Sequence, residues 1–338
     1  MKHGVERPAR RFFSQTDQGG TGKAMGNVRD LEDKLVVLVG GSGFFGSHLA
    51  QELLERGARL RVCSRHVERG YAIKALGNLG QVQFLRVNVQ NERSLAAAFL
   101  GADAVVNLVG AFKGDLDAVQ GRGAGRVAAL AKDAGAQAFV HVSAIGADAG
   151  SPVAYARTKA EGEAAVAAAF PGAVVVRPSV MFGADDAFLN LFGKVISQFP
   201  VVPVFGPEGR LQPVFVDDAA CAIATILSDF PAQAGKTFEL AGPEVLTMMD
   251  INQRIAKAQG RKPVLVPVGD AMAGLFASLP GTPLSRDQLA LLKAGSVASG
   301  TLPGLAELGL RARPLGLFLD RWMLRYRKAG RFGVKSLG

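Results

Sequence analysis

The chain has 338 residues, of which 49% are hydrophobic and 20% charged, a composition that indicates a globular protein and excludes a disordered one. Stretches without a charged side chain, such as Ala271–Ser285, are all shorter than the roughly 20 apolar residues that a membrane-spanning helix requires. Two cysteines are too few for a disulfide framework. No metal site is predicted, because a zinc centre needs four close ligands and the four histidines are scattered along the chain.

The chain carries 39 basic and 29 acidic residues, a net charge of +10. Much of the excess lies in residues 1–34 and near the C-terminus. Neither region has the interleaved aromatic residues of an RNA-binding sheet. We therefore do not predict a nucleic-acid partner.

Apolar runs and helix-period segments alternate from residue 35 onwards. Leu35–Val39 is continuously apolar, as in a parallel strand that is buried on both faces. A glycine-rich turn and a predicted helix at Phe44–Arg56 follow it. Further strands are predicted at Leu60–Cys63, Val82–Val87, Ala104–Val109, Ala138–Val142 and Ala173–Val176, and further helices at Leu116–Ala134 and Ala154–Phe170. This alternation predicts an α/β fold with a Rossmann-type doubly wound parallel sheet.

After Gly183 the pattern loosens into a proline-rich stretch with short predicted helices at Ala219–Ser228, Met249–Gln259 and Arg286–Ala294. We expect a smaller C-terminal α/β lobe packed on the sheet. We expect a disordered or non-native tail over residues 1–34 and a second tail over 331–338. The expected Rossmann core covers residues 35–185, with return segments near 212–240 that include Phe215 and Phe238. The expected smaller lobe covers residues 186–211 and 241–330.

Three glycines, Gly40, Gly43 and Gly46, lie directly after the first predicted strand and open the first predicted helix. A nucleotide-binding loop needs glycine there for a tight turn, a close approach of the backbone to a diphosphate, and close helix–strand packing. The free N–H groups and the positive end of the helix dipole then face the phosphates. An ordinary tight turn is the alternative, but the strand–turn–helix context favours nucleotide binding.

The end of the second predicted strand indicates which nucleotide is bound. Sites that prefer NAD usually place Asp or Glu there for the ribose hydroxyls, whereas this chain has Ser64 and Arg65. An arginine can pair with the 2′-phosphate of NADPH, so NADPH is favoured over NADH. The alternative is that Arg65 is a solvated surface residue.

Tyr155 and Lys159 are four residues apart and share a face of a predicted helix. We expect the ammonium of Lys159 to lower the pKa of the Tyr155 phenol, so that tyrosine can transfer a proton while Ser143 orients the same substrate oxygen. Alternatively, Tyr155 and Lys159 only hold the nicotinamide ribose. The spacing of the residues does not separate these two interpretations.

Taken together, these motifs resemble the extended or atypical short-chain dehydrogenase/reductase superfamily over about Leu35–Lys262. Besides the glycine loop and Tyr155/Lys159, the similar segments are Asn107–Gly110, His141–Ser143, Arg177–Ser179, Val216–Ala220 and Glu239–Pro243. Within the superfamily, residues 40–46 and 155–163 and the basic C-terminal end are most similar to the nucleotide-binding accessory subunits of respiratory complex I and their bacterial relatives.

The resemblance implies a role for each matching position. The diphosphate would contact Gly40, Ser42, Gly43, Phe44, Phe45 and Gly46, and the adenosine part would contact Ser64, Arg65, Asn88 and Val89. The nicotinamide ribose would lie on Leu108, Val109 and Gly110 beside Tyr155 and Lys159, with the carboxamide near Pro178, Ser179 and Val180. Asn88 departs from the aspartate that many relatives have at this position.

The resemblance also implies a structural NADPH, complex I subunits and the membrane surface as partners, and a peripheral location on the cytoplasmic side of a bacterial inner membrane, or on the matrix side in a mitochondrion. The alternative is an active reductase, dehydrogenase or epimerase for a quinone-, lipid- or sugar-like molecule. The segment Ala144–Ala154 is shorter than in sugar-modifying relatives, which argues against a nucleotide-sugar substrate.

Two further features have alternative interpretations. The apolar and basic stretch from Leu315 to Leu324 is either a membrane-surface helix or a terminal helix that packs on its own lobe. The acidic pair Asp217 and Asp218 is expected to act as a helix N-cap and dipole partner, not as a metal or acid site.

Overall fold

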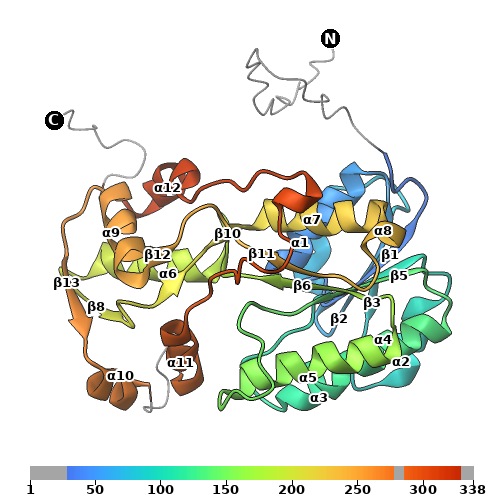
Figure 1. Cartoon of the computed structure of the whole chain (residues 1–338). Helices are drawn as coiled ribbons and strands as arrows, with labels where there is room; N and C mark the ends of the chain where they lie inside the picture. The colour runs from blue at the N-terminus through green and yellow to red at the C-terminus, as the bar shows by residue number, and fades with distance from the viewer. Residues whose placement is uncertain (1–28, 278–284, 329–338) are drawn as a thin grey trace, which may run out of the picture.

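Seven parallel strands form the central sheet of the computed structural model, which describes residues 29–277 and 285–328 (Figure 1). Most of the predicted N-terminal tail and all of the tail predicted for residues 331–338 lie outside the described residues. The prediction of disorder was wrong for residues 29–34. Leu31 is buried in the core, and its N–H donates to the Arg56 carbonyl at the end of the first helix. This segment is therefore packed against the folded chain.

The strand order of the sheet is β11-β6-β5-β4-β1-β2-β3. Chain order reverses between β1 and β4, so this is a doubly wound Rossmann-type sheet, as predicted. Register pairs Val39 with both Cys63 and Asn107, so the ends of three neighbouring strands lie level. The strands are β1 Leu35–Val39, β2 Arg59–Ser64, β3 Val82–Arg86, β4 Ala104–Asn107, β5 Ala138–Val142, β6 Val174–Pro178 and β11 Thr237–Leu240.

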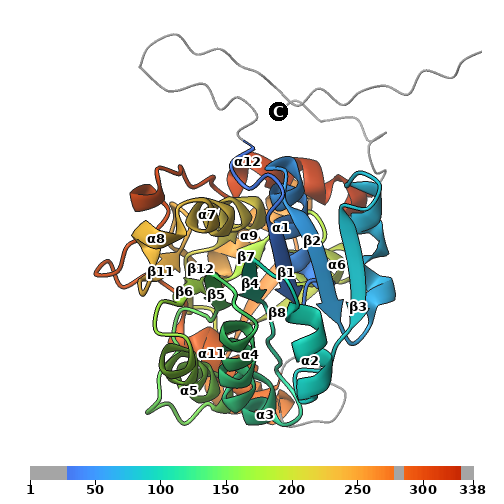
Figure 2. The ribbon, with the colours of Figure 1, turned by 90° about the vertical axis from the view of Figure 1, so that its right-hand side faces the viewer.

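Helices cover both faces of the sheet (Figures 1 and 2). Val36 and Leu38 of β1 face one core with α1 and α7, and Val37 and Val39 face the other core with α2, α4 and α5. Burial on both faces explains why the strand sequences are continuously apolar. These helices are α1 Phe44–Glu55, α2 Glu92–Phe99, α3 Leu116–Gln120, α4 Arg122–Asp133, α5 Ala154–Ala169, α7 Val216–Ser228 and α8 Phe230–Gln233.

The single helix predicted at Leu116–Ala134 is interrupted at Gly121, which separates α3 from α4. The carboxylate of Asp117 accepts from the backbone N–H of Arg122 at 3.1 Å and so replaces a helical carbonyl. A side chain that competes for a backbone donor in this way can end a helix despite a favourable periodicity.

The second lobe contains three two-stranded sheets and several helices. One sheet pairs β8 Val201–Phe205 with β13 Val264–Val268, and the two others pair β7 Met181–Phe182 with β10 Val214–Phe215 and β9 Arg210–Leu211 with β12 Leu246–Thr247. The helices are α6 Ala187–Gln198, α9 Met248–Ala258, α10 Asp270–Phe276, α11 Arg286–Ala294 and α12 Gly316–Trp322, with 3₁₀ turns η2 Ala306–Leu308 and η3 Met323–Tyr326. A further 3₁₀ turn, η1 Val67–Ala75, connects β2 and β3 of the central sheet.

The two expected return segments differ. Phe238 lies on β11, which joins the central sheet beside β6, whereas Phe215 lies on β10, which pairs with β7 outside it. Phe215 still belongs to the core, because its ring stacks on Phe318 with a centroid distance of 4.3 Å.

The C-terminal stretch packs on its own lobe, which was one of its two interpretations. Leu315, Leu319 and Met323 are buried, and Phe318 stacks on Trp322. These apolar side chains are therefore not free to enter a bilayer. Within the described residues, no helix has the length and hydropathy needed to cross a membrane.

Candidate functional site

The turn from β1 into α1 has the geometry expected of a nucleotide-binding loop. Gly40 has a φ of +86°, a conformation that favours glycine, and its N–H donates to the Cys63 carbonyl at 2.8 Å. A Cβ atom on Gly46 would clash with the Gly41 carbonyl oxygen, so glycine is required for close packing there. The fold itself therefore requires two of the three glycines.

Gly43 differs, because nothing in the chain itself requires glycine there. Its φ of −82° and ψ of 176° suit any residue, and the nearest atom to an added Cβ is the Gly40 carbonyl oxygen at 3.5 Å. The first-turn amides of α1, including those of Phe44 and Phe45, have no partner within their helix. Open space in front of free N–H groups fits the diphosphate of a dinucleotide.

Ser42 and Ser64 join the glycine loop to the end of β2. Their hydroxyl oxygens are 2.6 Å apart, and Ser64 Oγ also accepts from the His66 N–H at 3.2 Å. The neighbouring Arg65 is exposed, and its side chain has no hydrogen bond or ion pair with any other described residue. A cation without a protein partner at this strand end is available to a phosphate.

Asn88 and Val89 follow β3 at the same edge. The Asn88 side-chain oxygen accepts from the Gln90 N–H at 3.1 Å, and the Asn88 carbonyl accepts from Asn91. Val89 is buried. The Asn88 side chain thus holds the turn that follows β3 at this edge of the sheet.

The loop after β4 lies against the glycine loop. A Cβ atom on Gly40 would be 3.3 Å from Val109 Cγ2 and 3.4 Å from the Leu108 carbonyl carbon. On the other side, Gly110 approaches Lys159 Nζ, which is 3.5 Å from the position of an added Cβ. The predicted diphosphate and ribose contacts are therefore adjacent at the point where strand order reverses.

Lys159 is buried beneath this loop. Its ammonium donates to the carbonyls of Val142 at 3.0 Å and Val109 at 3.5 Å, and burial lowers its pKa to about 8 although Glu163 acts in the opposite direction. Ser143 is also buried, and its hydroxyl has no partner among the described residues. An unpartnered buried hydroxyl at this position fits an additional polar group from a ligand.

The prediction that Lys159 lowers the pKa of Tyr155 was wrong for this structure. Burial raises the pKa of Tyr155 to about 12. The reason is geometric: the ammonium is directed at two main-chain carbonyls, while the Tyr155 ring stacks on Phe112 with a centroid distance of 4.5 Å. The phenol is thus a weak acid in the state described here.

Pro178, Ser179 and Val180 follow β6 at the same edge of the sheet. Pro178 is buried, and the Ser179 hydroxyl donates to the Ser296 carbonyl at 2.8 Å. The hydroxyl is therefore engaged with the second lobe, and Ser179 serves as a link between the two parts of the molecule.

Sequence reasoning gave no separate role to a buried polar pair on β4 and β5. Asn107 Nδ2 lies 3.2 Å from His141 Nδ1, and Asn107 Oδ1 accepts from the Val109 N–H. Burial, with the Lys159 charge, lowers the pKa of His141 to about 3, so this ring is neutral. The available signal was the presence of polar residues within otherwise apolar strand sequences. The pair orients the backbone on which the nicotinamide ribose is expected to lie.

A histidine contact between α1 and α7 was also missed. His48 Nδ1 lies 2.5 Å from Asp217 and Nε2 lies 3.1 Å from Asp185, although these residues are far apart in sequence. Asp217 and Asp218 lie in the first turn of α7, where they suit the helix dipole, but the N-cap is Phe215 and not either aspartate. The expected N-cap role was therefore wrong, because the helix begins one residue earlier than the acidic pair.

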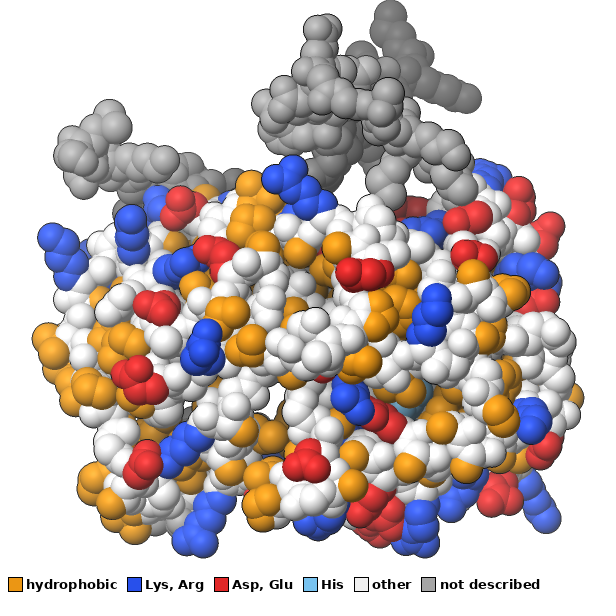
Figure 3. Space-filling model, viewed as in Figure 1, with side chains coloured by type: hydrophobic (Ala, Val, Ile, Leu, Met, Phe, Trp, Pro, Cys, Tyr) orange, Lys and Arg blue, Asp and Glu red, His pale blue; other side chains and the backbone are white. Residues whose placement is uncertain are grey.

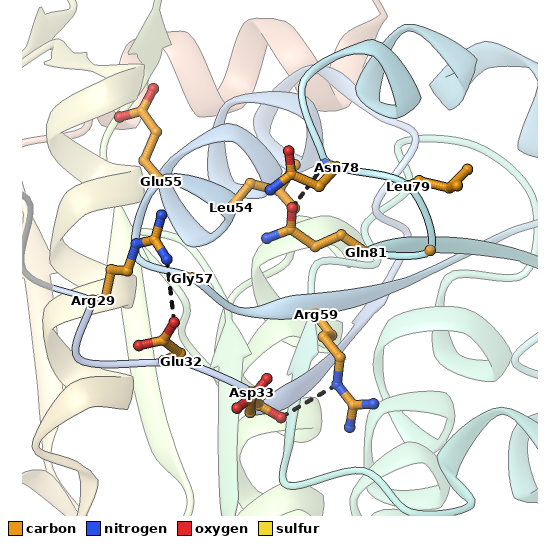
Figure 4. Close-up of a pocket in the computed structure, with 11 residues that line it drawn as sticks. Arg29, Glu32, Asp33, Leu54, Glu55, Gly57, Arg59, Asn78, Leu79 and Gln81 are labelled. Carbon is orange, nitrogen blue, oxygen red and sulfur yellow. Dashed lines mark hydrogen bonds and ion pairs between the residues drawn. The ribbon is translucent and has the colours of Figure 1, made fainter.

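A cavity of about 500 Å³ lies elsewhere, at the opposite edge of the sheet (Figure 4). Gly57, Arg59 and Gln81, which line it, precede or open β2 and β3. In doubly wound sheets, ligands bind at the carboxyl ends of the strands. We therefore assign the candidate site to the glycine loop and its neighbours, not to this cavity.

A family model described as NAD(P)H-binding matches residues 40–181, the part that contains the glycine loop and the Tyr155–Lys159 pair. Three relatives extend the similarity. NADH dehydrogenase [ubiquinone] 1 alpha subcomplex subunit 9, mitochondrial, is 32% identical in Dictyostelium discoideum (70% of this chain, 68% of the relative) and 30% identical in Rattus norvegicus (89% and 83%). The ceramide reductase of Caulobacter vibrioides is 29% identical (74% and 80%).

The fold is similar to that of a solved reductase. The triphenylmethane reductase of Citrobacter sp., complexed with NADP(H), superposes with a TM-score of 0.69 and 19% identity, and the alignment covers 85% of this chain and 99% of that one. This likeness supports the Rossmann-type architecture.

Proposed function

The chain belongs to the family of NADH dehydrogenase [ubiquinone] 1 alpha subcomplex subunit 9, and from this premise we propose that it is an accessory subunit of respiratory complex I that holds a structural NADPH. The observation that carries the proposal is the open space at Gly43, in front of the first-turn amides of α1. NADPH is preferred to NADH because Arg65 follows β2 where an acidic residue would repel a 2′-phosphate.

A structural nucleotide would stabilise the subunit by binding only its folded state. At 100 times its dissociation constant, such a ligand adds about 2.7 kcal/mol to the free energy of unfolding. The proposed contacts come from the ends of β1, β2, β4 and β6, and Ser179 continues from β6 to the second lobe through Ser296. One bound molecule would thus hold several loops in place.

We propose complex I subunits and the adjacent membrane surface as partners, and a peripheral position on the cytoplasmic side of a bacterial inner membrane, or on the matrix side in a mitochondrion. The named relatives are mitochondrial proteins. The positive charge is not gathered into one patch on the face seen in Figure 3, where basic and acidic side chains alternate.

A second candidate is an active reductase for a lipid-like molecule. It is favoured by the unpartnered Ser143 hydroxyl beside Lys159, and by the similarity to a ceramide reductase. In this case Ser143 would orient a carbonyl oxygen and Tyr155 would supply the proton. Bound NADPH would supply the hydride.

Purification from native membranes under mild detergent separates the two functions. If the chain is an accessory subunit, we expect the tagged protein to elute together with NADH:quinone oxidoreductase activity. We also expect it to retain NADPH, and this NADPH should not be oxidised when ceramide precursors or quinones are added. An enzyme would instead elute alone and consume NADPH when an acceptor is added. A Tyr155→Phe variant should keep its nucleotide and its assembly in the first case and lose turnover in the second.

A further inference from the structure

Phe112 lies over Tyr155 at the open side of the proposed nucleotide site. The two rings are almost parallel, with an interplanar angle of 11° and a centroid distance of 4.5 Å. The other face of Phe112 is open to solvent, since the residue is 54% exposed. Phe112 therefore covers one face of a Tyr155 ring that is itself only partly buried.

The segment that carries Phe112 is fixed at both of its ends. On one side, the Ala111 N–H donates to the buried Gln120 side chain at 3.0 Å. On the other side, Asp115 caps α3 by accepting from the Ala118 N–H. Between these points Gly114 has a φ of +87° and an added Cβ there would meet nothing within 4 Å. Phe112 is thus held over α5, which lies beside α3 (Figures 1 and 2).

The polar groups of the neighbouring segment 144–154 are already used within the chain. The Asp148 carboxylate accepts from the Gly150 N–H at 2.9 Å, and the Ser151 hydroxyl accepts from Val153. Arg157 donates to the Ser151 carbonyl. Within segment 144–154, these contacts leave few polar side-chain groups for a sugar or another strongly polar group.

We propose that Phe112 is an aromatic cover that closes the site above Tyr155 and restricts it to apolar groups that can pack against a ring. This inference rests on the proposed nucleotide site but concerns its other end, where an acceptor would approach. Such a cover would limit the approach of polar oxidants to a nucleotide held at this site. In the reductase function, the cover makes Phe112 a specificity-determining residue.

Nitration by tetranitromethane tests the cover in the nucleotide-free chain, because the reagent must reach the phenol. Tyr71, which is 56% exposed, serves as an internal reference. We expect Tyr155 to react at least tenfold more slowly than Tyr71 in the wild type, and to approach the rate of Tyr71 in Phe112→Ala, as measured by peptide mass spectrometry. Phe199→Ala is the matched control, since Phe199 is also 54% exposed but lies after α6 in the second lobe.

Circular dichroism and thermal unfolding would verify that both variants fold. Equal nitration of Tyr155 and Tyr71 in the wild type, or unchanged protection in folded Phe112→Ala, would overturn the proposal. Because no nucleotide is present, this result is independent of whether the chain binds NADPH.

The apolar preference is tested in the same Phe112→Ala protein. We expect 2,3-dimethyl-1,4-naphthoquinone to restore protection of Tyr155, because it is planar and apolar, and UDP-glucose to leave the nitration rate unchanged. Protection by UDP-glucose, or by neither compound, would overturn the apolar assignment.

Discussion

Each glycine of the loop after β1 has a different physical role. Gly40 supplies a positive φ and Gly46 allows the helix to approach the strand, so both are needed by the fold with or without a ligand. Gly43 has ordinary backbone angles and free space around it. A side chain at Gly43 would therefore be harmful only if a group is bound there, which makes this residue the most informative position to change.

We predict that Gly43→Thr lowers the affinity for NADPH at least about tenfold while the unfolding temperature of the free chain stays within about 2 °C. Threonine and glycine are similarly acceptable at an N-cap, so the fold should tolerate the change. Gly269→Thr is the matched control, because Gly269 is also an extended N-cap residue with nothing near an added Cβ. Equal affinities of the two variants for NADPH would show that the diphosphate does not lie at Gly43.

The contact of His48 with two aspartates makes stability depend on pH. Burial alone would lower the pKa of His48, but hydrogen bonds to Asp217 and Asp185 raise it above its usual value. The charged form is therefore favoured by folding, so this stabilisation is complete below about pH 6.5 and is lost as pH rises through the folded-state pKa.

We predict that His48→Gln lowers the free energy of unfolding by about 1 kcal/mol at pH 6 and by less at pH 9. Urea unfolding at both pH values measures this difference. His66→Gln is the control, since His66 is exposed and its ring pairs with the exposed Glu68. A loss for His48→Gln that is the same at both pH values would mean that the ion pairs do not contribute.

At the scale of elements, the ion pair of Asp218 with Arg313 attaches the C-terminal segment to α7. Asp218 is buried and accepts from the Arg313 N–H at 2.8 Å and from its Nε at 2.6 Å. The guanidinium also lies 4.4 Å from the centre of the Phe215 ring. One arginine thus connects a helix N-terminus, an aromatic core and the chain that leads to α12.

We predict that Arg313→Ala destabilises the protein by about 2 kcal/mol, because the buried Asp218 carboxylate loses its cationic partner and keeps the main-chain N–H bond. The partial exposure of the arginine reduces this effect. Arg311→Ala, at an exposed neighbouring position, should change stability by less than about 0.5 kcal/mol. Chemical denaturation measures both. Similar losses in the two variants would indicate a general charge effect in place of this pair.

The elements that sequence predicted well are those whose signal is local. The strands of the central sheet are buried on both faces, so each is a continuous apolar run. The glycine loop was likewise predicted from adjacent residues. What could not be predicted depends on distant segments, such as the Ser179–Ser296 bond across 117 positions or His48–Asp217 across 169. The acidity of Tyr155 was misjudged for the same reason, since it depends on Phe112 and on where Lys159 points.

At the scale of the whole molecule, the chain combines a Rossmann-type sheet with a second lobe that is joined to it by specific contacts. β11 adds to the sheet after a long excursion through that lobe, and the Ser179–Ser296 bond connects both parts at the carboxyl edge. A nucleotide at this edge would contact the loops that these connections hold together. In our account the molecule is therefore a nucleotide-stabilised docking unit.

The most direct test is calorimetric titration of the nucleotide-free chain with NADPH and NADH, in the wild type and in Arg65→Ala. We predict one site per chain, with an affinity for NADPH at least about tenfold higher than for NADH. Arg65→Ala should remove this preference, because the 2′-phosphate loses a charged partner. Lys132→Ala, which removes an exposed charge from the end of α4, should leave the preference unchanged. The absence of heat with either dinucleotide in a folded, nucleotide-free wild-type chain would contradict the account.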